Sequence, residues 1–181
     1  MTPFLHLNFK LDLTPIYNEL PNIKWNLHER HNLLNCDLPY IYKQEIRLLF
    51  NLPQDHFMVI HNIEPYTETS INRPRTTYFH IDSHRYSAIM IPLSLDNPNH
   101  YTEFQVDNNV MRTHYTQGVP VLYNTKVLHK ATSIDSSANR NLIAIGIIKT
   151  TYDDLVEMYL NGSLINYDKF EQSFLKPKLL S

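Results

Sequence analysis

Three side chains of the kinds that commonly bind metal ions have a spacing that could bring them together. His80 and Asp82 lie two apart in the segment TYFHIDSHRYSAIMIPL, residues 77–93, and on an extended strand such residues point to the same face. His129 lies far downstream, in LYNTKVLHKAT. Two imidazoles and one carboxylate can occupy one face of an Fe(II) ion and leave its other positions open. We therefore interpret His80, Asp82 and His129 as a candidate metal site.

Two other interpretations of the same short motif stay open. A histidine and an aspartate two residues apart can arise by chance, so the pair has weight only together with a third ligand. His80 and His84 are also four apart, which is the spacing of a zinc pair on a helix. The β-branched and aromatic neighbours favour a strand there, and zinc favours a closed tetrahedral set of ligands.

A candidate binding group for an anion follows further along the chain. Arg140 opens the least polar segment, RNLIAIGII, and a guanidinium that points inward at that place needs an anion, for which a carboxylate has the matching planar shape. The alternative is a solvated arginine in the loop SSANRN. Tyr78 shares the predicted face of His80, where it could hydrogen-bond a bound ligand or simply fill the mouth of a barrel.

Further basic side chains flank the histidine and aspartate motif. Arg73 and Arg75 precede it, and His84 and Arg85 follow it. They could form a basic rim that shapes the entry of a substrate, as loops near a site often do. We interpret them instead as parts of solvated loops.

The elements that must position these residues are predicted from short β-rich runs separated by turn residues. Eight such runs follow one another within residues 57–150, with no helix-length pattern between them. Eight strands without crossover helices predict an antiparallel sandwich or barrel. The expected fold is therefore mainly β with flanking helices, a double-stranded β-helix or jelly roll of the cupin-like kind.

The two ends of the chain carry helix signals, and the length predicts one domain over residues 1–181. Residues 1–55 are expected as a helical lead-in, with Thr14 as an N-cap before Pro15. Residues 151–181 are expected as a C-terminal helix and tail, with Thr151 or Asp153 as the cap and Gly162 as the end.

Composition excludes several classes of protein. Three glycines are too few for a dinucleotide fingerprint, a phosphate-binding P-loop or a GxSxG nucleophile elbow. The net charge of −2 gives no overall attraction for nucleic acid, although a local basic patch would escape such a count. The apolar run at residues 142–148 is too short to cross a bilayer, so no membrane partner is expected.

The expected location is cytoplasmic. Cys36 is the single cysteine, so the chain cannot form an internal disulfide. The N-terminus MTPFLHLNFKLDL has neither the basic start nor the long apolar run of a secretory signal.

The order HxD, distant histidine and then a basic residue resembles the Fe(II)- and 2-oxoglutarate-dependent oxygenases. The resemblance covers roughly residues 57–150, where His80, Asp82 and His129 match the metal ligands of that family. Arg140 matches its basic residue for the far carboxylate of the cosubstrate, and Gly118 matches a glycine that often precedes the distal ligand. The closing segment YDDLVEMYLNGSLI resembles that of small phage-encoded members.

The resemblance implies a dioxygenase with Fe(II), 2-oxoglutarate and O2. Such an enzyme would hydroxylate a C–H bond of a small molecule or of a peptide or protein side chain and release succinate and CO2. Its partners would be 2-oxoglutarate and a substrate that the sequence does not name. The alternative is a non-catalytic cupin-like module that binds a ligand or a partner without redox chemistry.

Overall fold

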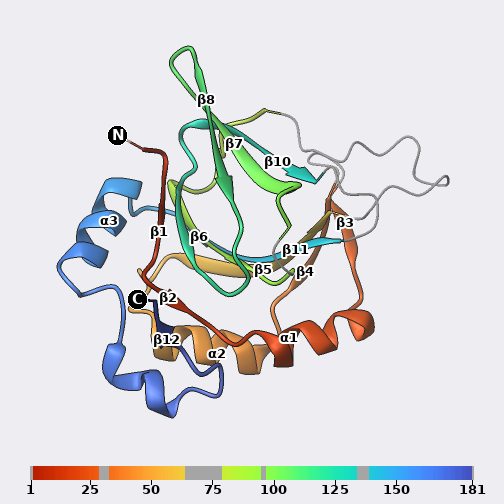
Figure 1. Ribbon diagram of the computed structural model, residues 1–181, viewed down its shortest axis with the longest axis vertical. Coiled ribbons are helices and arrows are strands. Elements are labelled where there is room, and N and C mark those ends of the chain that lie inside the picture. Colours follow the sequence, from red (N-terminus) through yellow and green to blue (C-terminus); the bar gives the residue numbers. More distant parts are fainter. Residues whose placement is uncertain (1, 29–32, 64–78, 95–96, 134–138, 181) are drawn as a thin grey trace.

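Two β-sheets stacked on each other form the centre of the computed structural model, and helices α1 and α2 cover the far side of the larger sheet (Figure 1). The structure describes residues 2–28, 33–63, 79–94, 97–133 and 139–180. Within this part of the chain, no helix is long and apolar enough to span a membrane.

The larger sheet has seven strands in the order β1, β9, β6, β11, β5, β4, β3, and every neighbouring pair is antiparallel. Its members are β1 (Phe4–His6), β3 (Asn26–His28), β4 (Leu33–Asp37), β5 (His56–Ile63), β6 (Ser87–Pro92), β9 (Val121–Asn124) and β11 (Arg140–Ile147).

The smaller sheet has the order β10, β7, β8, and a short bridge extends it. Its strands are β7 (His100–Val106), β8 (Asn109–His114) and β10 (Leu128–Ser133). His80 pairs with His129 on the free side of β10. Around the HxD motif, where a strand was expected, the described residues 79–82 form only this one bridge.

The order of the strands defines the fold as the predicted jelly roll. Among the eight segments from β5 to β11, the first, third, sixth and eighth lie in the larger sheet. The bridge at His80 and strands β7, β8 and β10 lie in the smaller one. An antiparallel pair of chain segments thus winds between two sheets, which is a double-stranded β-helix.

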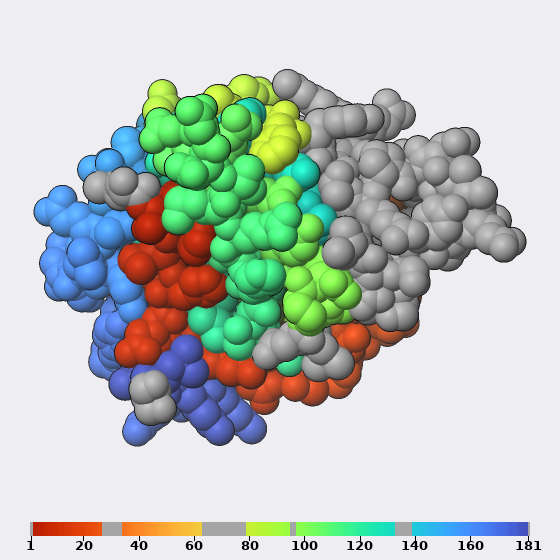
Figure 2. Space-filling view, turned by 45° about the horizontal axis from the view of Figure 1, so that its top comes forward, coloured from red at the N-terminus to blue at the C-terminus, as the bar shows by residue number. Residues whose placement is uncertain are grey.

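The N-terminal segment contains the expected helices and also contributes strands, which the expected helical lead-in did not include. Helices α1 (Thr14–Glu19) and α2 (Tyr40–Leu49) are accompanied by the 3-10 helix η1 (Leu20–Asn22). Strands β1, β3 and β4 extend the larger sheet at both edges, and β2 (Phe9–Lys10) pairs with β12 (Lys178–Leu179). In Figure 2 the red N-terminal segment lies on the surface between blue C-terminal residues and the green strands.

The predicted cap of the first helix was wrong. Thr14 is the first helical residue, and Leu13 occupies the N-cap position without a capping side chain. The Oδ1 atom of Asp12 accepts a hydrogen bond from the backbone N–H of Thr14 at 3.0 Å. The carboxylate two residues upstream therefore satisfies a backbone donor at the start of this helix.

The C-terminal helix follows the prediction. Helix α3 (Tyr152–Leu160) begins after Thr151, whose Oγ1 atom accepts a hydrogen bond from the backbone N–H of Asp154, while the Asp154 carboxylate accepts one from that of Thr151. This reciprocal pair is a capping box. Gly162 follows the helix with φ of 79°, and the 3-10 helix η3 (Tyr167–Gln172) comes after it.

The larger sheet is buried on both faces, which explains why its central strands are apolar almost throughout. On β11, Ile143 and Ile145 pack under the helices, whereas Leu142 and Ala144 face the smaller sheet. The core under the helices is much the larger of the two. The inner face is therefore free to carry polar side chains over part of its area.

Gly118, which precedes β9, has a conformation and surroundings that only glycine tolerates. Its φ is 76°, and a Cβ atom there would lie 2.2 Å from the backbone oxygen of Leu11. Its own backbone N–H donates to Pro92 and its carbonyl accepts from Leu11, both at 2.9 Å. The glycine thus lets the N-terminal segment pass directly over the turn that leads into β9.

Replacing Gly118 with alanine should lower the free energy of unfolding by about 3 kcal/mol, because the left-handed backbone is disfavoured and a backbone clash is added. Gly162 is the matched control: it has φ of 79° but nothing within 4 Å of a Cβ. Gly162→Ala should therefore cost only about 1–2 kcal/mol. Urea unfolding of both variants measures the difference, and equal losses would contradict the close approach at Gly118.

Candidate metal centre

Backbone pairing brings His80 and His129 together although they are far apart in the sequence. Each of the two residues donates its backbone N–H to the carbonyl of the other at 2.9 Å. Residues paired in this way in antiparallel chains project their side chains on the same side. The centroids of the two imidazole rings are accordingly 4.5 Å apart.

Asp82 completes the group from two positions beyond His80. Its Oδ1 atom lies 3.6 Å from Nε2 of His80, and its Oδ2 atom lies 3.8 Å from Nε2 of His129. One possible ligand atom from each of the three residues lies within 4.8 Å of the others. The structure therefore brings together the three residues that the sequence predicts as a metal site.

The turn before β10 holds Asp82 in place. Its backbone N–H donates to the carbonyl of Thr125 at 3.1 Å, and its carbonyl accepts from Nζ of Lys126 at 2.8 Å. The residues after His80 therefore run beside the turn that precedes β10. The segment that carries His80 and Asp82 is thus hydrogen-bonded at two places to the segment that leads to His129, at His80 and at Asp82.

The protonation states of His129 and Asp82 suit the binding of a metal cation. Burial lowers the pKa of His129 to about 4 against the opposing effect of Asp82, so this imidazole is neutral near pH 7. Burial would raise the pKa of Asp82, but the Arg85 guanidinium and the two imidazoles outweigh it and hold that pKa below its usual value. A neutral imidazole and an ionised carboxylate are the forms that coordinate a metal.

The contacts of His129 also orient its ring for coordination. Its Nδ1 atom lies 2.8 Å from the backbone oxygen of Val127, and at neutral pH that contact requires Nδ1 to carry the proton and donate. The lone pair is then on Nε2, which is the atom that faces Asp82. Histidines that bind a metal through one ring nitrogen typically donate a hydrogen bond from the other. The donor set and its orientation therefore fit a divalent transition metal.

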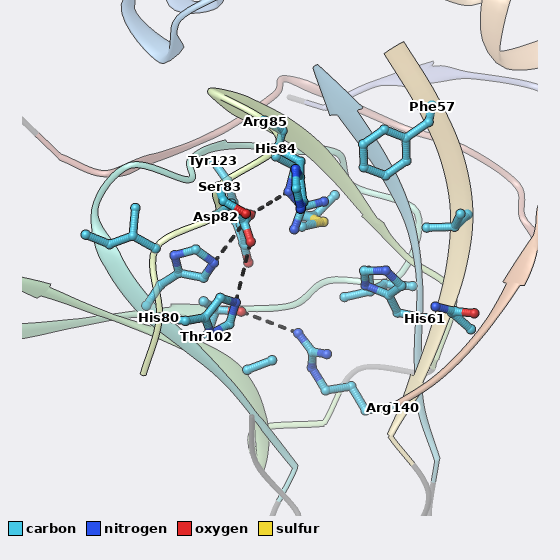
Figure 3. Close-up of a pocket in the computed structure, with 17 residues that line it drawn as sticks. Phe57, His61, His80, Asp82, Ser83, His84, Arg85, Thr102, Tyr123 and Arg140 are labelled. Carbon is cyan, nitrogen blue, oxygen red and sulfur yellow. Dashed lines mark hydrogen bonds and ion pairs between the residues drawn. The ribbon is translucent and has the colours of Figure 1, made fainter. Parts of the chain in front are cut away.

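The group lies in the wall of a cavity of about 300 Å³ between the two sheets (Figure 3). His80 and Asp82 lie on one side of the cavity, Phe57 and His61 lie opposite, and Arg140 points in from below. The remaining lining residues are Asn35, Val59, Ile81, Ser83, His84, Arg85, Met90, Thr102, Tyr123, His129, Ala131 and Leu142.

Arg140 points inward from the start of β11, on the same face of the strand as Leu142 and Ala144. The residue is only 4% exposed. Its Nη2 atom donates to the hydroxyl of Tyr115 and, at 3.4 Å, to Oγ1 of Thr102. The alternative of a solvated loop arginine is therefore wrong for this position.

The hydroxyl of Tyr115 connects Arg140 to two further side chains. It accepts hydrogen bonds from Arg140 and, at 2.9 Å, from the hydroxyl of Tyr123. With both lone pairs used, it must donate its own proton to Thr102. Burial and the neighbouring Tyr115 raise the pKa of Tyr123 well above its usual value, so Tyr123 keeps its proton as a donor.

The Arg140 guanidinium is left without a negative partner in the part of the chain that the structure describes. Its Nε atom is buried with no hydrogen-bond partner there, and no carboxylate forms an ion pair with it. A buried, unpaired charge is costly. Arg140 is therefore a candidate binding group for an anion.

Of the other candidate residues, three lie outside the described part of the chain, and the interpretation of a fourth was wrong. Tyr78, Arg73 and Arg75 lie outside the described residues. Arg85 was interpreted as part of a solvated loop, which is wrong: its side chain is 11% exposed and its Nε atom donates to Oδ2 of Asp82 at 2.5 Å. The short turn after the HxD motif directs it back to the carboxylate three residues earlier.

The sequence did not single out Thr102, Tyr115 or Tyr123 as parts of the site. Thr102 lies two residues before the buried Phe104 on β7 and shares its inward face. That alternation could have placed Thr102 in the cavity, but nothing in the sequence indicates that Tyr115 meets Arg140. Asn35, which was missed, and His61, for which no role in a site was expected, are paired across β4 and β5 and line the cavity.

The structure is similar to solved structures of non-haem iron oxygenases. A prolyl-4-hydroxylase from Pseudomonas putida matches with a TM-score of 0.60 at 10% identity, over 82% of this chain and 93% of the other. The alpha-ketoglutarate-dependent epimerase SnoN of nogalamycin biosynthesis gives 0.55 at 10% identity, over 82% and 79%. A 2OG-Fe(II) oxygenase family oxidoreductase from Burkholderia pseudomallei gives 0.52 at 10% identity, over 77% and 81%.

A scan of protein-family models and a search of curated proteins give no match. At 10% identity the structural likeness shows a shared fold, which is the fold of proteins that include 2OG-Fe(II) oxygenases. The group of His80, Asp82 and His129 fits the HxD and distant-histidine motif. The class that fold and site define is thus a jelly roll with a facial group of two histidines and one carboxylate.

Removal of either imidazole should abolish stable metal binding, because two ligands hold a divalent cation much more weakly than three. Wild-type protein loaded with Fe(II) or Co(II) without oxygen should retain about one ion per chain after desalting, and His80→Ala and His129→Ala should each retain almost none. His114→Ala, at an exposed position of β8, is the control. Wild-type metal content in His80→Ala would contradict the assignment.

Proposed function

We propose that this chain is an Fe(II)- and 2-oxoglutarate-dependent dioxygenase that hydroxylates a C–H bond of a small molecule or of a peptide or protein side chain. One observation carries the proposal. A single cavity contains the group of His80, Asp82 and His129 and, on another wall, the buried guanidinium of Arg140, which has no acidic partner in the described residues.

In this proposal the three clustered side chains hold the metal through Nε2 of each histidine and one oxygen of Asp82. Fe(II) and 2-oxoglutarate, when bound there, would supply O2 activation and the oxidative decarboxylation that gives succinate and CO2. The ligands come from one side of the site, so the side toward the cavity stays open for the cosubstrate and for the substrate.

Arg140 would bind the far carboxylate of 2-oxoglutarate. Tyr115 and Thr102 already take hydrogen bonds from its Nη2 atom, so the guanidinium cannot swing away when the cavity is empty. A preorganised cation of this kind binds a carboxylate with little ordering cost.

Apolar residues around the same cavity would exclude water from the reacting atoms. Met90 and Leu142 from the larger sheet, Ala131 from the smaller one and Phe57 from β5 all line it. A dry wall protects reactive intermediates from side reactions and strengthens the charge interactions inside. These residues also restrict the volume left for a substrate.

The proposal is tested by turnover without the natural substrate. Wild-type protein with Fe(II), ascorbate and O2 should slowly convert 2-oxoglutarate to succinate, and His129→Ala should not. Metal-loaded protein that neither binds 2-oxoglutarate nor produces succinate would overturn it, and the cupin-like binding module would then be favoured. Thermal denaturation with and without 2-oxoglutarate measures binding independently of turnover.

Arg140→Gln should weaken 2-oxoglutarate binding about 10- to 100-fold and leave metal binding intact, since charge-assisted hydrogen bonds contribute roughly 1.5–3 kcal/mol. Calorimetric titration of the Mn(II)-loaded protein without oxygen measures the affinity. Arg47→Gln, at an exposed position of α2, is the matched control. Unchanged affinity in Arg140→Gln would show that the dicarboxylate is bound elsewhere.

Tyr115→Phe should have a smaller effect in the same titration. It removes the hydroxyl that orients the guanidinium and accepts the Tyr123 proton, at a net cost of about 1 kcal/mol, or about fivefold in affinity. Tyr167→Phe, on the exposed side of η3, should leave the affinity unchanged. Equal affinities of both variants would mean that Arg140 is oriented without Tyr115.

A further inference from the structure

A second arginine faces the cavity and is not used by the proposed cosubstrate. Arg85 lines the cavity beside Asp82 (Figure 3). Its Nε atom donates to Oδ2 of Asp82 at 2.5 Å, and its guanidinium carbon lies 5.9 Å from the centre of the Phe57 ring. Its backbone carbonyl accepts from Oγ1 of Thr125 at 2.9 Å, so the residue is held in the same turn as the metal ligand.

The terminal amino groups of Arg85 are available to a ligand. Only the Nε side of the guanidinium is engaged by Asp82, and the Nη1 and Nη2 atoms have no hydrogen-bond partner within the described ranges. The side chain is 11% exposed and belongs to the lining of the cavity. If Arg85 only formed the ion pair with Asp82, it would not need two further donors at the cavity.

The charges that line the cavity show what kind of ligand is missing. Apart from the histidines and the neutral Tyr123, the ionisable lining residues among those described are one carboxylate, Asp82, and two guanidiniums, Arg85 and Arg140. Binding of a divalent cation and of the 2-oxoglutarate dianion leaves the net charge of this set at one positive unit. At the same time the cation competes with Arg85 for the Asp82 carboxylate. A poorly solvated cation left in this state is unfavourable.

We propose that the substrate is a small carboxylic acid and that Arg85 binds its carboxylate. This inference rests on the proposed function. A single carboxylate supplies the one negative charge that the described lining of the loaded cavity lacks, and its two oxygens match the planar pair of donors on Arg85. A cavity of about 300 Å³ is at the lower end of the range for small-molecule sites, which favours a small acid.

The position of Arg85 also restricts where oxidation occurs. The arginine contacts Asp82, which is itself a proposed metal ligand, so a carboxylate bound to Arg85 lies close to the metal. The C–H bond that reacts must then lie within a few bonds of the acid group. Long acids whose reactive carbon is remote from the carboxylate would not fit this arrangement.

The probe for the experiment is acetate, because it carries the proposed group and little else. Protein loaded with Mn(II) and 2-oxoglutarate without oxygen is titrated with acetate, and the relaxation of the acetate methyl protons by Mn(II) is measured. Zn(II)-loaded protein gives the diamagnetic reference. Wild-type protein should show saturable enhancement in the millimolar range, and acetamide, which is neutral and of similar shape, should show none.

Arg85→Gln should bind acetate at least tenfold more weakly, whereas Arg85→Lys, which keeps the charge, should retain part of the affinity. Arg47→Gln should behave as wild type. Equal acetate affinity in Arg85→Gln, equal binding of acetamide, or no saturable effect in loaded wild-type protein would each overturn the inference. A neutral compound that stimulates succinate production as a substrate would also overturn it.

The loading step separates the two proposals. Affinities for Mn(II) and 2-oxoglutarate are measured before acetate is added. Wild-type protein that fails to load contradicts the proposed oxygenase, and the inference about Arg85 falls with it. Wild-type protein that loads but ignores acetate contradicts only the role of Arg85. The variant Arg85→Gln can still donate a hydrogen bond to Asp82. Loss of Mn(II) and 2-oxoglutarate binding in both Arg85→Gln and Arg85→Lys would therefore mean that Arg85 only positions the metal ligand.

Discussion

The pair of backbone hydrogen bonds between His80 and His129 is the constraint on which the candidate site depends. It sets the register of the short bridge against β10, and with that register both imidazoles lie on the inner face. A shift by one residue would turn His80 and Asp82 outward together, because side chains alternate along an extended chain. The contacts of Asp82 with Thr125 and Lys126 oppose such a shift.

The larger sheet makes a polar cavity possible without loss of the hydrophobic core. Most of the buried apolar side chains lie between this sheet and the helices, where Ile89, Ile143 and Ile145 pack with residues of α1, α2 and α3. The space between the two sheets holds a much smaller apolar cluster that includes Phe104 and Leu142. Since the first core buries so much apolar surface, the second space can accommodate charged and hydroxyl groups.

Charge is distributed unevenly around that cavity. Asp82 is shared between Arg85 and the space that a metal would occupy, whereas Arg140 is held by hydroxyl groups alone. Hydroxyls orient a guanidinium but do not neutralise it, so its charge stays available to a ligand. The arrangement therefore combines a group of three possible metal ligands with two buried or largely buried guanidiniums, which is the basis for proposing acidic ligands.

Much of the fold and of the site could be predicted from the sequence. The alternation of apolar residues with turn signals predicted eight strands, of which seven form as β5 to β11 and one is a bridge at His80 in the described residues. The HxD spacing predicted a shared face for His80 and Asp82. Capping signals around Thr151 and Gly162 predicted α3. These features depend on neighbours within a few residues, where the backbone geometry alone decides which side chains lie together.

The tertiary structure alone decided the rest. Strands β1, β3 and β4 carry weak local signals and form because the edges of the larger sheet offer them partners. Arg85 turned out to be largely buried against Asp82. Tyr115 and Thr102 turned out to contact Arg140 through pairings between segments distant in the chain. The sequence by itself determines which side chains share a face of a strand. The order and register of strands distant in the chain determine which faces meet, and the cavity with its charged side chains results from that meeting.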